Sequence, residues 1–268
     1  MSFRKRYFFF DIDGTLIPSS EEPVIPPSAR AGIDELRRRG HFCCLATGRS
    51  EYMSRDLCRE LGFDNLVSDG GYGITLEGQL LGIQPLDKEK CILLAQECDR
   101  LGYAWAVSPD NDDIRWTKDQ RFVELSKNHY MRTLVREDLD MESYPQILKM
   151  YVGVPPGEED RITMLKEVPW TRDQDLYVFV EPADKAGGIR RVMDHYGAPY
   201  EDVVVFGDQR NDLSMFYPEE WTCIAMGNAC EDVKARATYV TRDVRDDGLA
   251  HALHHFGWID SVNKFGVE

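Results

Sequence analysis

The chain has 268 residues, 43% of them hydrophobic and 29% charged, a composition typical of a globular protein whose core fills one large domain or two smaller ones. Its formal net charge of −15 excludes the basic footprint that duplex nucleic acid and anionic membrane surfaces require. No uncharged stretch approaches the ~18 residues of a membrane span. The 7 cysteines form no Cys-x-x-Cys pair and predict free buried thiols in a reducing cytosol, hence a cytoplasmic protein.

The first predicted element is a strand at residues 7–10, an unbroken apolar run that stops on two carboxylates and a glycine. Such a run is typical of a parallel strand buried on both faces, and in open α/β sheets the chemistry lies beyond the carboxyl ends of the strands. If the strand continued, Asp11 and Asp13 would point to one face. Burying two like charges together is costly unless they share a cation or a proton, so we expect this pair to be functional.

The same design recurs twice. A strand at 42–46 runs into Thr47-Gly48-Arg49, and a strand at 203–206 runs into a loop rich in Asp and Asn at 207–212. Further elements predicted in these two regions are helices at about 27–39, 50–61, 185–196 and 249–256, a short helix before Pro218, strands at 66–67, 222–226 and 239–241, a turn at 70–73 and a small hairpin near 74–78. Alternation of strands and helices predicts an α/β domain.

Between the two regions the pattern changes. Here we predict a helix ending at Gly102, strands at 103–107 and 114–117, a helix at 120–130, a strand at 147–154, a short helix at 158–166 and a strand at 176–180. Patterning of this kind favours an α+β domain with an antiparallel sheet, inserted between two parts of the α/β domain.

Four sequence motifs follow one another along the chain: Asp-x-Asp-Gly-Thr-Leu at 11–16, Ala-Thr-Gly-Arg at 46–49, Lys185, and Gly-Asp-x-x-Asn-Asp at 207–212. Together they resemble the four motifs of the haloacid dehalogenase superfamily, and most of all its Cof-type sugar-phosphatase branch, over roughly residues 5–82 and 184–250. The resemblance implies a Rossmann-like α/β core at 1–83 and 184–268, with a parallel sheet and helices on both faces. It also implies an inserted α+β cap at 84–183 that sets substrate specificity.

The resemblance also implies roles for three catalytic residues. Asp11 would be the nucleophile that forms an aspartyl-phosphate. Asp13 would protonate the leaving alcohol and then activate water. Lys185 would neutralise charge on Asp11 and on the phosphoryl oxygens. Each has a structural alternative: Asp11 can cap a turn, Asp13 can form an Asx-turn with Gly14, and most lysines are simply solvated.

The implied cofactor is Mg²⁺, held by the Asp11 side chain, the Asp13 backbone carbonyl and the Asp208 side chain. Asn211 and Asp212 would order these ligands or contact phosphate, although Asp and Asn also favour helix starts. Thr47 and Gly48 would bind phosphate oxygens together with Lys185 and Asn211.

In one place the sequence departs from the family pattern: Asp69 stands where the family usually has Asn, which adds negative charge near the phosphate site unless Arg210 offsets it.

The expected function is Mg²⁺-dependent hydrolysis of a small phosphorylated metabolite, a sugar phosphate by analogy, with no protein partner implied. Two alternatives stay open: a phosphomutase with the same nucleophile, and a catalytically silent binding or regulatory protein. The four intact motif residues disfavour the second.

Overall fold

The computed structural model describes residues 4–18, 24–173 and 176–260. They fall into two compact units. The first is built from Met1–Arg49, Ser54–Leu81 and Asp184–Glu268, and the second from Gly82–Ala183 with Ser50–Met53.

The first unit is organised around a sheet with the order β14-β13-β12-β1-β2-β3-β4-β5. Its strands are β1 (Tyr7–Phe10), β2 (Phe42–Ala46), β3 (Leu66–Ser68), β4 (Gly73–Leu76), β5 (Gln79–Ile83), β12 (Val203–Gly207), β13 (Thr222–Ala225) and β14 (Tyr239–Val240). From β14 to β3 neighbouring strands run parallel, and β4 is antiparallel to β3. β1 therefore lies in the middle, between β12 and β2.

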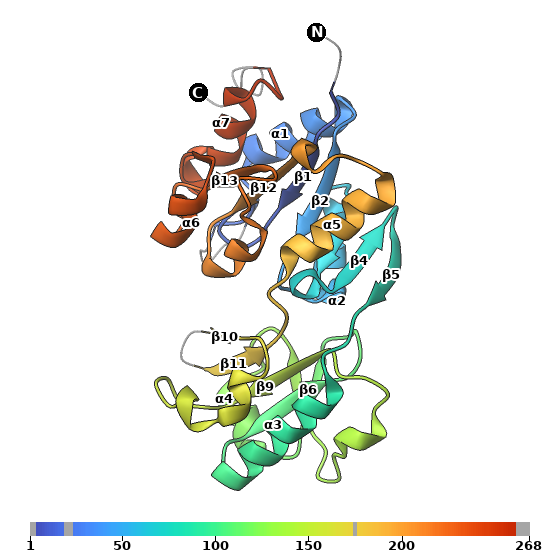
Figure 1. Ribbon diagram of the computed structural model, residues 1–268, viewed down its shortest axis with the longest axis vertical. Coiled ribbons are helices and arrows are strands. Elements are labelled where there is room, and N and C mark those ends of the chain that lie inside the picture. Colours follow the sequence, from blue (N-terminus) through green and yellow to red (C-terminus); the bar gives the residue numbers. More distant parts are fainter. Residues whose placement is uncertain (1–3, 19–23, 174–175, 261–268) are drawn as a thin grey trace. The chain divides into compact units, whose positions relative to one another are not determined.

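Helices cover both faces of this sheet (Figure 1). Phe8 and Phe10 pack in a core with α1 (Pro27–Arg38), α2 (Glu51–Glu60) and α7 (Gly248–His255). The alternate residues Tyr7 and Phe9 pack in a second core with α5 (Lys185–Tyr196) and α6 (Glu231–Arg236). Because successive strand side chains point to opposite faces, a strand covered on both sides must be apolar throughout. The predicted α/β core with a parallel sheet is confirmed.

The second unit contains a sheet with the order β10-β11-β9-β6-β7-β8. Its elements are α3 (Lys88–Leu101), β6 (Trp105–Ser108), β7 (Ile114–Thr117), α4 (Gln120–Ser126), β8 (Arg132–Val135), β9 (Lys149–Val152), β10 (Trp170–Asp173) and β11 (Tyr177–Val180). One face packs on α3 through Cys91, Leu94 and Cys98. Mixed helix and sheet of this kind agree with the predicted α+β character.

Several details of the prediction were wrong. The helix expected at 120–130 ends at Ser126, since Lys127 and Asn128 adopt φ of 49° and 54°, and β8 follows. β8 pairs parallel with β7, so the sheet is not purely antiparallel. The helix expected at 158–166 consists of two 3₁₀ turns, η3 (Glu159–Arg161) and η4 (Thr163–Lys166). The strands β8 and β10 and the helix α6 were missed, because such short elements carry too few apolar positions to show a period.

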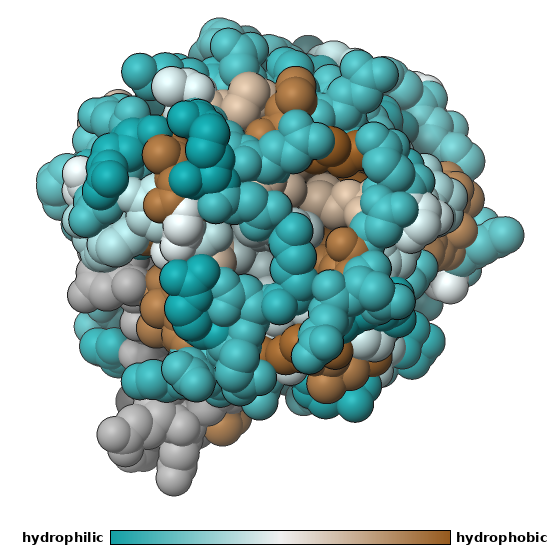
Figure 2. All heavy atoms as spheres, turned by 90° about the horizontal axis from the view of Figure 1, so that it is seen from below, coloured by the Kyte–Doolittle hydropathy of each residue, from teal (hydrophilic) through white to brown (hydrophobic). Residues whose placement is uncertain are grey.

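The remaining 3₁₀ turns are η1 (Asp69–Gly71), η2 (Met141–Ser143), η5 (Tyr200–Asp202), η6 (Arg210–Met215) and η7 (Val244–Asp246). Within the described ranges, no helix has both the length and the apolar character needed to cross a bilayer. Figure 2 shows one face of the molecule, where hydrophobic side chains form separate patches among hydrophilic ones.

Candidate active site

Asp11 lies where β1 ends, in the middle of the sheet. Its backbone N–H still donates to Phe206 O of β12 over 3.0 Å, but the strand stops at Phe10. The side chain is buried. Because β1 and β12 run parallel and end at the same edge, the residues that follow the two strands come together there.

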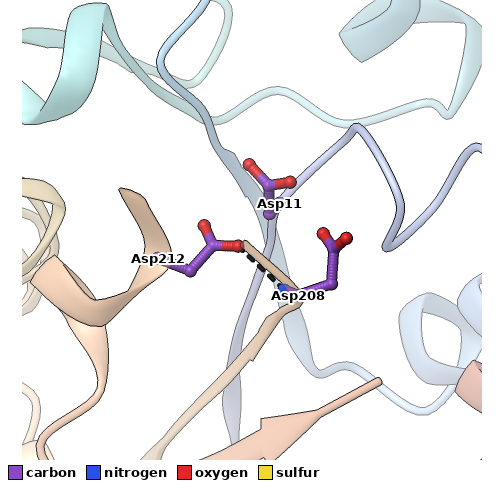
Figure 3. A group of neighbouring side chains, drawn as sticks. All are labelled: Asp11, Asp208 and Asp212. Carbon is purple, nitrogen blue, oxygen red and sulfur yellow. Dashed lines mark hydrogen bonds between the residues drawn. The ribbon is translucent and has the colours of Figure 1, made fainter. Parts of the chain in front are cut away.

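Asp208 follows β12 and lies beside Asp11 (Figure 3). Its carboxylate accepts from Thr15 Oγ1 over 3.2 Å and from Gln209 Nε2 over 3.1 Å. Gly14 has φ of 84°, and a Cβ there would come within 2.1 Å of Asp208 Oδ2. The glycine of the first motif is therefore required both by its backbone conformation and by the space that Asp208 occupies.

Lys185 and Asp212 complete the cluster. Lys185 Nζ donates to Asp11 Oδ1 over 2.7 Å and to Asp212 Oδ1 over 2.6 Å. The second oxygen of Asp212 accepts from the backbone N–H groups of Asp208 and Gln209, over 2.8 Å and 3.0 Å. Both carboxylate oxygens of Asp212 are thus engaged, and this residue orders its neighbours.

Lys185 is the first residue of α5, and the start of this helix is fixed by its neighbours. The Asp184 side chain caps the helix by accepting from Gly187 N over 3.0 Å, while Asp184 N donates to Gly70 O over 2.8 Å. At Gly71, with φ of 111°, a Cβ would lie 2.0 Å from Asp184 O. The glycine turn after β3 therefore lets the helix start approach closely, which places Lys185 in the site.

The cluster brings three buried carboxylates together with a single ammonium group. Burial, reinforced by the Asp212 charge and only partly opposed by Lys185, raises the pKa of Asp11 to about 8. Burial and Asp212 likewise raise the pKa of Asp208 to about 7. Burial alone would lower the pKa of Lys185, but the Asp11 and Asp212 carboxylates outweigh it and raise that pKa. One ammonium group can neutralise the charge of only one of the three carboxylates.

This donor set suits a hard divalent cation. One carboxylate oxygen from each of Asp11, Asp208 and Asp212 lies within 4.8 Å of the other two, and oxygen ligands are those that Mg²⁺ prefers. When all three carboxylates are ionised, they and the one ammonium group leave two negative charges in excess, which one Mg²⁺ would balance. The residues present therefore fit the implied metal.

Asp11 and Asp13 were expected to share a face only if the strand continued past Phe10. Since the strand ends at Phe10, alternation does not continue, and the turn is closed by a Gly14 N to Ile17 O bond of 2.7 Å. The Asp13 carboxylate lies outside the acidic cluster. It accepts instead from Arg49 Nε over 2.9 Å and from Nη2 over 2.5 Å, in a bidentate ion pair.

The expected phosphate contacts lie on separate loops. Thr47 is buried just after β2, the neighbour of β1, and its Oγ1 accepts from Arg49 N over 3.1 Å. Gly48 follows it. Asn211 is exposed at the start of η6, next to the buried Asp212. The described contacts thus join Asp11, Lys185, Asp208 and Asp212 directly, with Thr47 and Asn211 on adjacent loops.

The atypical Asp69 is buried, has φ of 52°, and donates its N–H to Arg49 O over 2.8 Å. Arg210, considered above as its counter-charge, pairs with Asp232 over 2.9 Å.

Sequence reasoning missed Asn228 altogether. Its Nδ2 donates to Gly14 O over 2.8 Å and to Asp208 Oδ2 over 3.3 Å, while its Oδ1 accepts from Val244 N over 3.0 Å. One side chain therefore ties the first-motif turn, the Asp208 carboxylate and the loop before α7. A usable signal existed: Asn228 is polar and follows β13, another parallel strand that ends at the same edge.

Comparison with known proteins extends these observations. A family model described as haloacid dehalogenase-like hydrolase matches residues 8–253. The "Putative phosphatase YkrA" of Bacillus subtilis is 30% identical over 259 residues, which cover 94% of this chain and 98% of that protein. The 5-amino-6-(5-phospho-D-ribitylamino)uracil phosphatase YcsE of the same organism is 25% identical, covering 92% and 93%.

A crystal structure of a hypothetical protein from Geobacillus kaustophilus is 30% identical and superposes with a TM-score of 0.82, covering 96% of this chain and all of that one. Sequence motifs, fold and relatives thus agree over nearly the whole length.

Proposed function

Since the chain belongs to the haloacid dehalogenase-like hydrolases and is a phosphatase, we propose that it hydrolyses a small phosphate monoester with Mg²⁺ through an aspartyl-phosphate on Asp11. The observation that carries this proposal is the contact of Lys185 Nζ with Asp11 Oδ1 at 2.7 Å, beside Asp208 and Asp212. A carboxylate held beside a fixed ammonium group and next to Asp208, a proposed metal ligand, is suited to attack a phosphoryl group.

In the first half-reaction an Asp11 oxygen forms a bond to phosphorus while the bond from phosphorus to the ester oxygen breaks. Asp13 gives a proton to the departing alcohol oxygen. In the second half-reaction Asp13 takes a proton from water, whose oxygen attacks phosphorus and releases phosphate and the free Asp11 carboxylate. Lys185 offsets negative charge on Asp11 and on the phosphoryl oxygens throughout.

Mg²⁺, when bound by Asp11, the Asp13 carbonyl and Asp208, supplies charge neutralisation at the phosphoryl oxygens. Asp212 orders the site through Lys185 and the Asp208 backbone. Thr47, Gly48 and Asn211, on loops at the same edge of the sheet, bind the phosphate oxygens together with Lys185.

For the substrate we propose a small phosphorylated metabolite of the sugar-phosphate type. The name of YcsE, whose substrate carries a phosphate on a ribityl chain, supports this class. We further propose that residues 84–183 act as a cap that selects the alcohol part of the substrate, with hinges near Gly82 and Asp184, and that the protein works in the cytoplasm.

The test is release of inorganic phosphate from a panel of phosphorylated metabolites and from p-nitrophenyl phosphate, with Mg²⁺ and with excess chelator. The matched variant is Asp11→Asn, which keeps size and fold but cannot attack phosphorus. We expect the variant to lose at least about 10³-fold in kcat. Equal activity of Asp11→Asn and wild type, or full activity in chelator, would refute the mechanism. Conversion of one phosphate isomer into another, with no phosphate released, would instead identify a mutase.

A further inference from the structure

Two ion pairs in the site differ sharply in exposure. The Lys185 and Asp11 side chains are 2% and 7% exposed, whereas those of Arg49 and Asp13 are 29% and 55% exposed. A buried pair is held strongly, because separating it leaves uncompensated charges away from water. An exposed pair is screened by solvent and is worth little. The Lys185 pair is therefore a fixed part of the site, and the Arg49 pair can exchange partners.

The Arg49 guanidinium contacts both carboxylate oxygens of Asp13. Nε donates to one carboxylate oxygen and Nη2 to the other, over 2.9 Å and 2.5 Å. In the proposed reaction Asp13 must carry a proton to the leaving oxygen and later accept one from water. Proton transfer to or from Asp13 competes with this pairing, because both use the same two carboxylate oxygens. An opening of the pair during turnover would remove that competition.

The backbone of Arg49 is held by two hydrogen bonds, whereas its side chain is partly exposed. Its N–H donates to Thr47 Oγ1 over 3.1 Å, and its carbonyl accepts from Asp69 N over 2.8 Å. Arg49 directly follows Thr47 and Gly48, the proposed phosphate loop. A phosphate dianion on that loop offers the guanidinium a bidentate acceptor with more charge than one carboxylate carries.

We propose that Arg49 is a phosphate-responsive positioning residue for Asp13. Without substrate its guanidinium holds the Asp13 carboxylate. When a phosphate monoester binds, the guanidinium passes to the phosphoryl oxygens and frees Asp13 to act on the leaving oxygen. This inference rests on the proposed function, because it assigns the event that brings the acid–base residue into use.

A double-mutant cycle on the full-length protein tests the exchange. The affinity of inorganic phosphate is measured by calorimetry with Mg²⁺ for wild type, Asp13→Asn, Arg49→Gln and the double variant. If Arg49 must leave Asp13 to bind phosphate, Asp13→Asn should tighten binding about two- to fivefold, the range that an exposed pair contributes. Arg49→Gln should weaken binding, and in that background Asp13→Asn should change nothing. Equal tightening in both backgrounds would mean simple charge repulsion and would overturn the proposal.

Two further variants sharpen the result. Arg49→Lys keeps the charge but loses the fork, so it should bind phosphate more weakly than wild type; full recovery would contradict a bidentate exchange. Arg210→Gln removes a comparable exposed pair, with Asp232, and should leave phosphate affinity unchanged. A wild-type protein that neither binds phosphate nor releases it from p-nitrophenyl phosphate would refute the proposed function itself. Normal turnover with an additive cycle would refute only the exchange. Melting temperatures verify that each variant is folded.

Discussion

The ammonium group of Lys185 donates to Asp212 Oδ1 over 2.6 Å, and both side chains are almost fully buried. The same ammonium contacts Asp11, so a single cation joins two carboxylates that lie far apart in the sequence. Its removal would leave both carboxylates in a site that water barely reaches.

We therefore expect Lys185→Met to destabilise the metal-free protein by about 3–5 kcal/mol, the usual cost of breaking a buried ion pair. Urea unfolding at pH 7 measures this free energy. The matched control is Lys118→Met, because Lys118 forms an ion pair with Asp99 in which both side chains are well exposed; its loss should cost no more than about 1 kcal/mol. Similar losses for both variants would show that the Lys185 pair contributes no more than a surface pair.

The raised pKa values of Asp11, about 8, and Asp208, about 7, predict how stability depends on pH. Both groups bind protons more tightly in the folded protein than in the unfolded chain. Below about pH 4, the pKa of these groups in the unfolded chain, their contribution to the free energy of unfolding is fully present. It is lost as the pH rises through 7 to 8, the pKa values in the folded protein. Metal binding requires the ionised carboxylates, so Mg²⁺ should protect most at high pH.

Melting temperatures in chelator and in Mg²⁺, taken between pH 5 and 9, check this linkage. The difference between the two conditions should widen as pH rises. Asp208→Asn should flatten the pH dependence in chelator, since one of the two titrating groups is gone. A gap that stays constant or narrows with pH would contradict the assignment of these carboxylates to the metal.

Asn228 gives a third prediction. Asn228→Ala removes the donor to Gly14 O and Asp208 Oδ2 and the acceptor for Val244 N. We expect a loss of roughly 1–3 kcal/mol in unfolding free energy, together with weaker Mg²⁺ binding because Asp208 is no longer oriented. Calorimetric titration with Mg²⁺ measures the affinity. A destabilised variant with unchanged Mg²⁺ affinity would limit Asn228 to a purely structural role.

In the second unit, Arg115 should be essential to the stability of the sheet edge. It is fully buried, and it donates to Thr133 Oγ1 over 2.8 Å and to Tyr177 OH over 3.0 Å. Its guanidinium also lies 4.9–5.5 Å from the centres of three aromatic rings. Arg115→Met leaves the hydroxyl partners without these donors, and we expect roughly 2–4 kcal/mol of destabilisation.

Hydrogen exchange locates that effect. Protection should fall in β7 and β8, whereas the amides of β1 and β12 in the first unit should change little. The control is Arg132→Met at the start of β8, which removes an exposed ion pair with Asp113 just before β7 and should change stability by less than about 1 kcal/mol. Loss of protection spread evenly over both units would contradict a local role for Arg115.

Local sequence patterns determined much of this protein. The run at residues 7–10 predicted a strand covered on both faces, and glycines at 102 and 197 end helices in the left-handed conformation that they adopt at little steric cost. Asp11 and Asp208 were expected to be functional because they follow strands whose ends meet at one edge of a parallel sheet, whereas Lys185 was singled out only by its place in the order of the family motifs. Short elements such as β8 and β10 were not predicted, because a strand of four residues that includes charged side chains shows no apolar period.

Only the tertiary structure decided what the polar residues contact. The sequence predicted that the strand would stop before Asp11, but nothing in the spacing of Asp11 and Asp13 showed that the Asp13 carboxylate would pair with Arg49. The sequence likewise did not show that the Asn228 side chain donates to Gly14 O, more than two hundred residues away in the chain. A hydrogen bond or an ion pair forms only when folding brings two side chains to the right distance within a few tenths of an ångström. Hydrophobic periodicity, in contrast, is a property of neighbouring positions and can be recognised from the sequence alone.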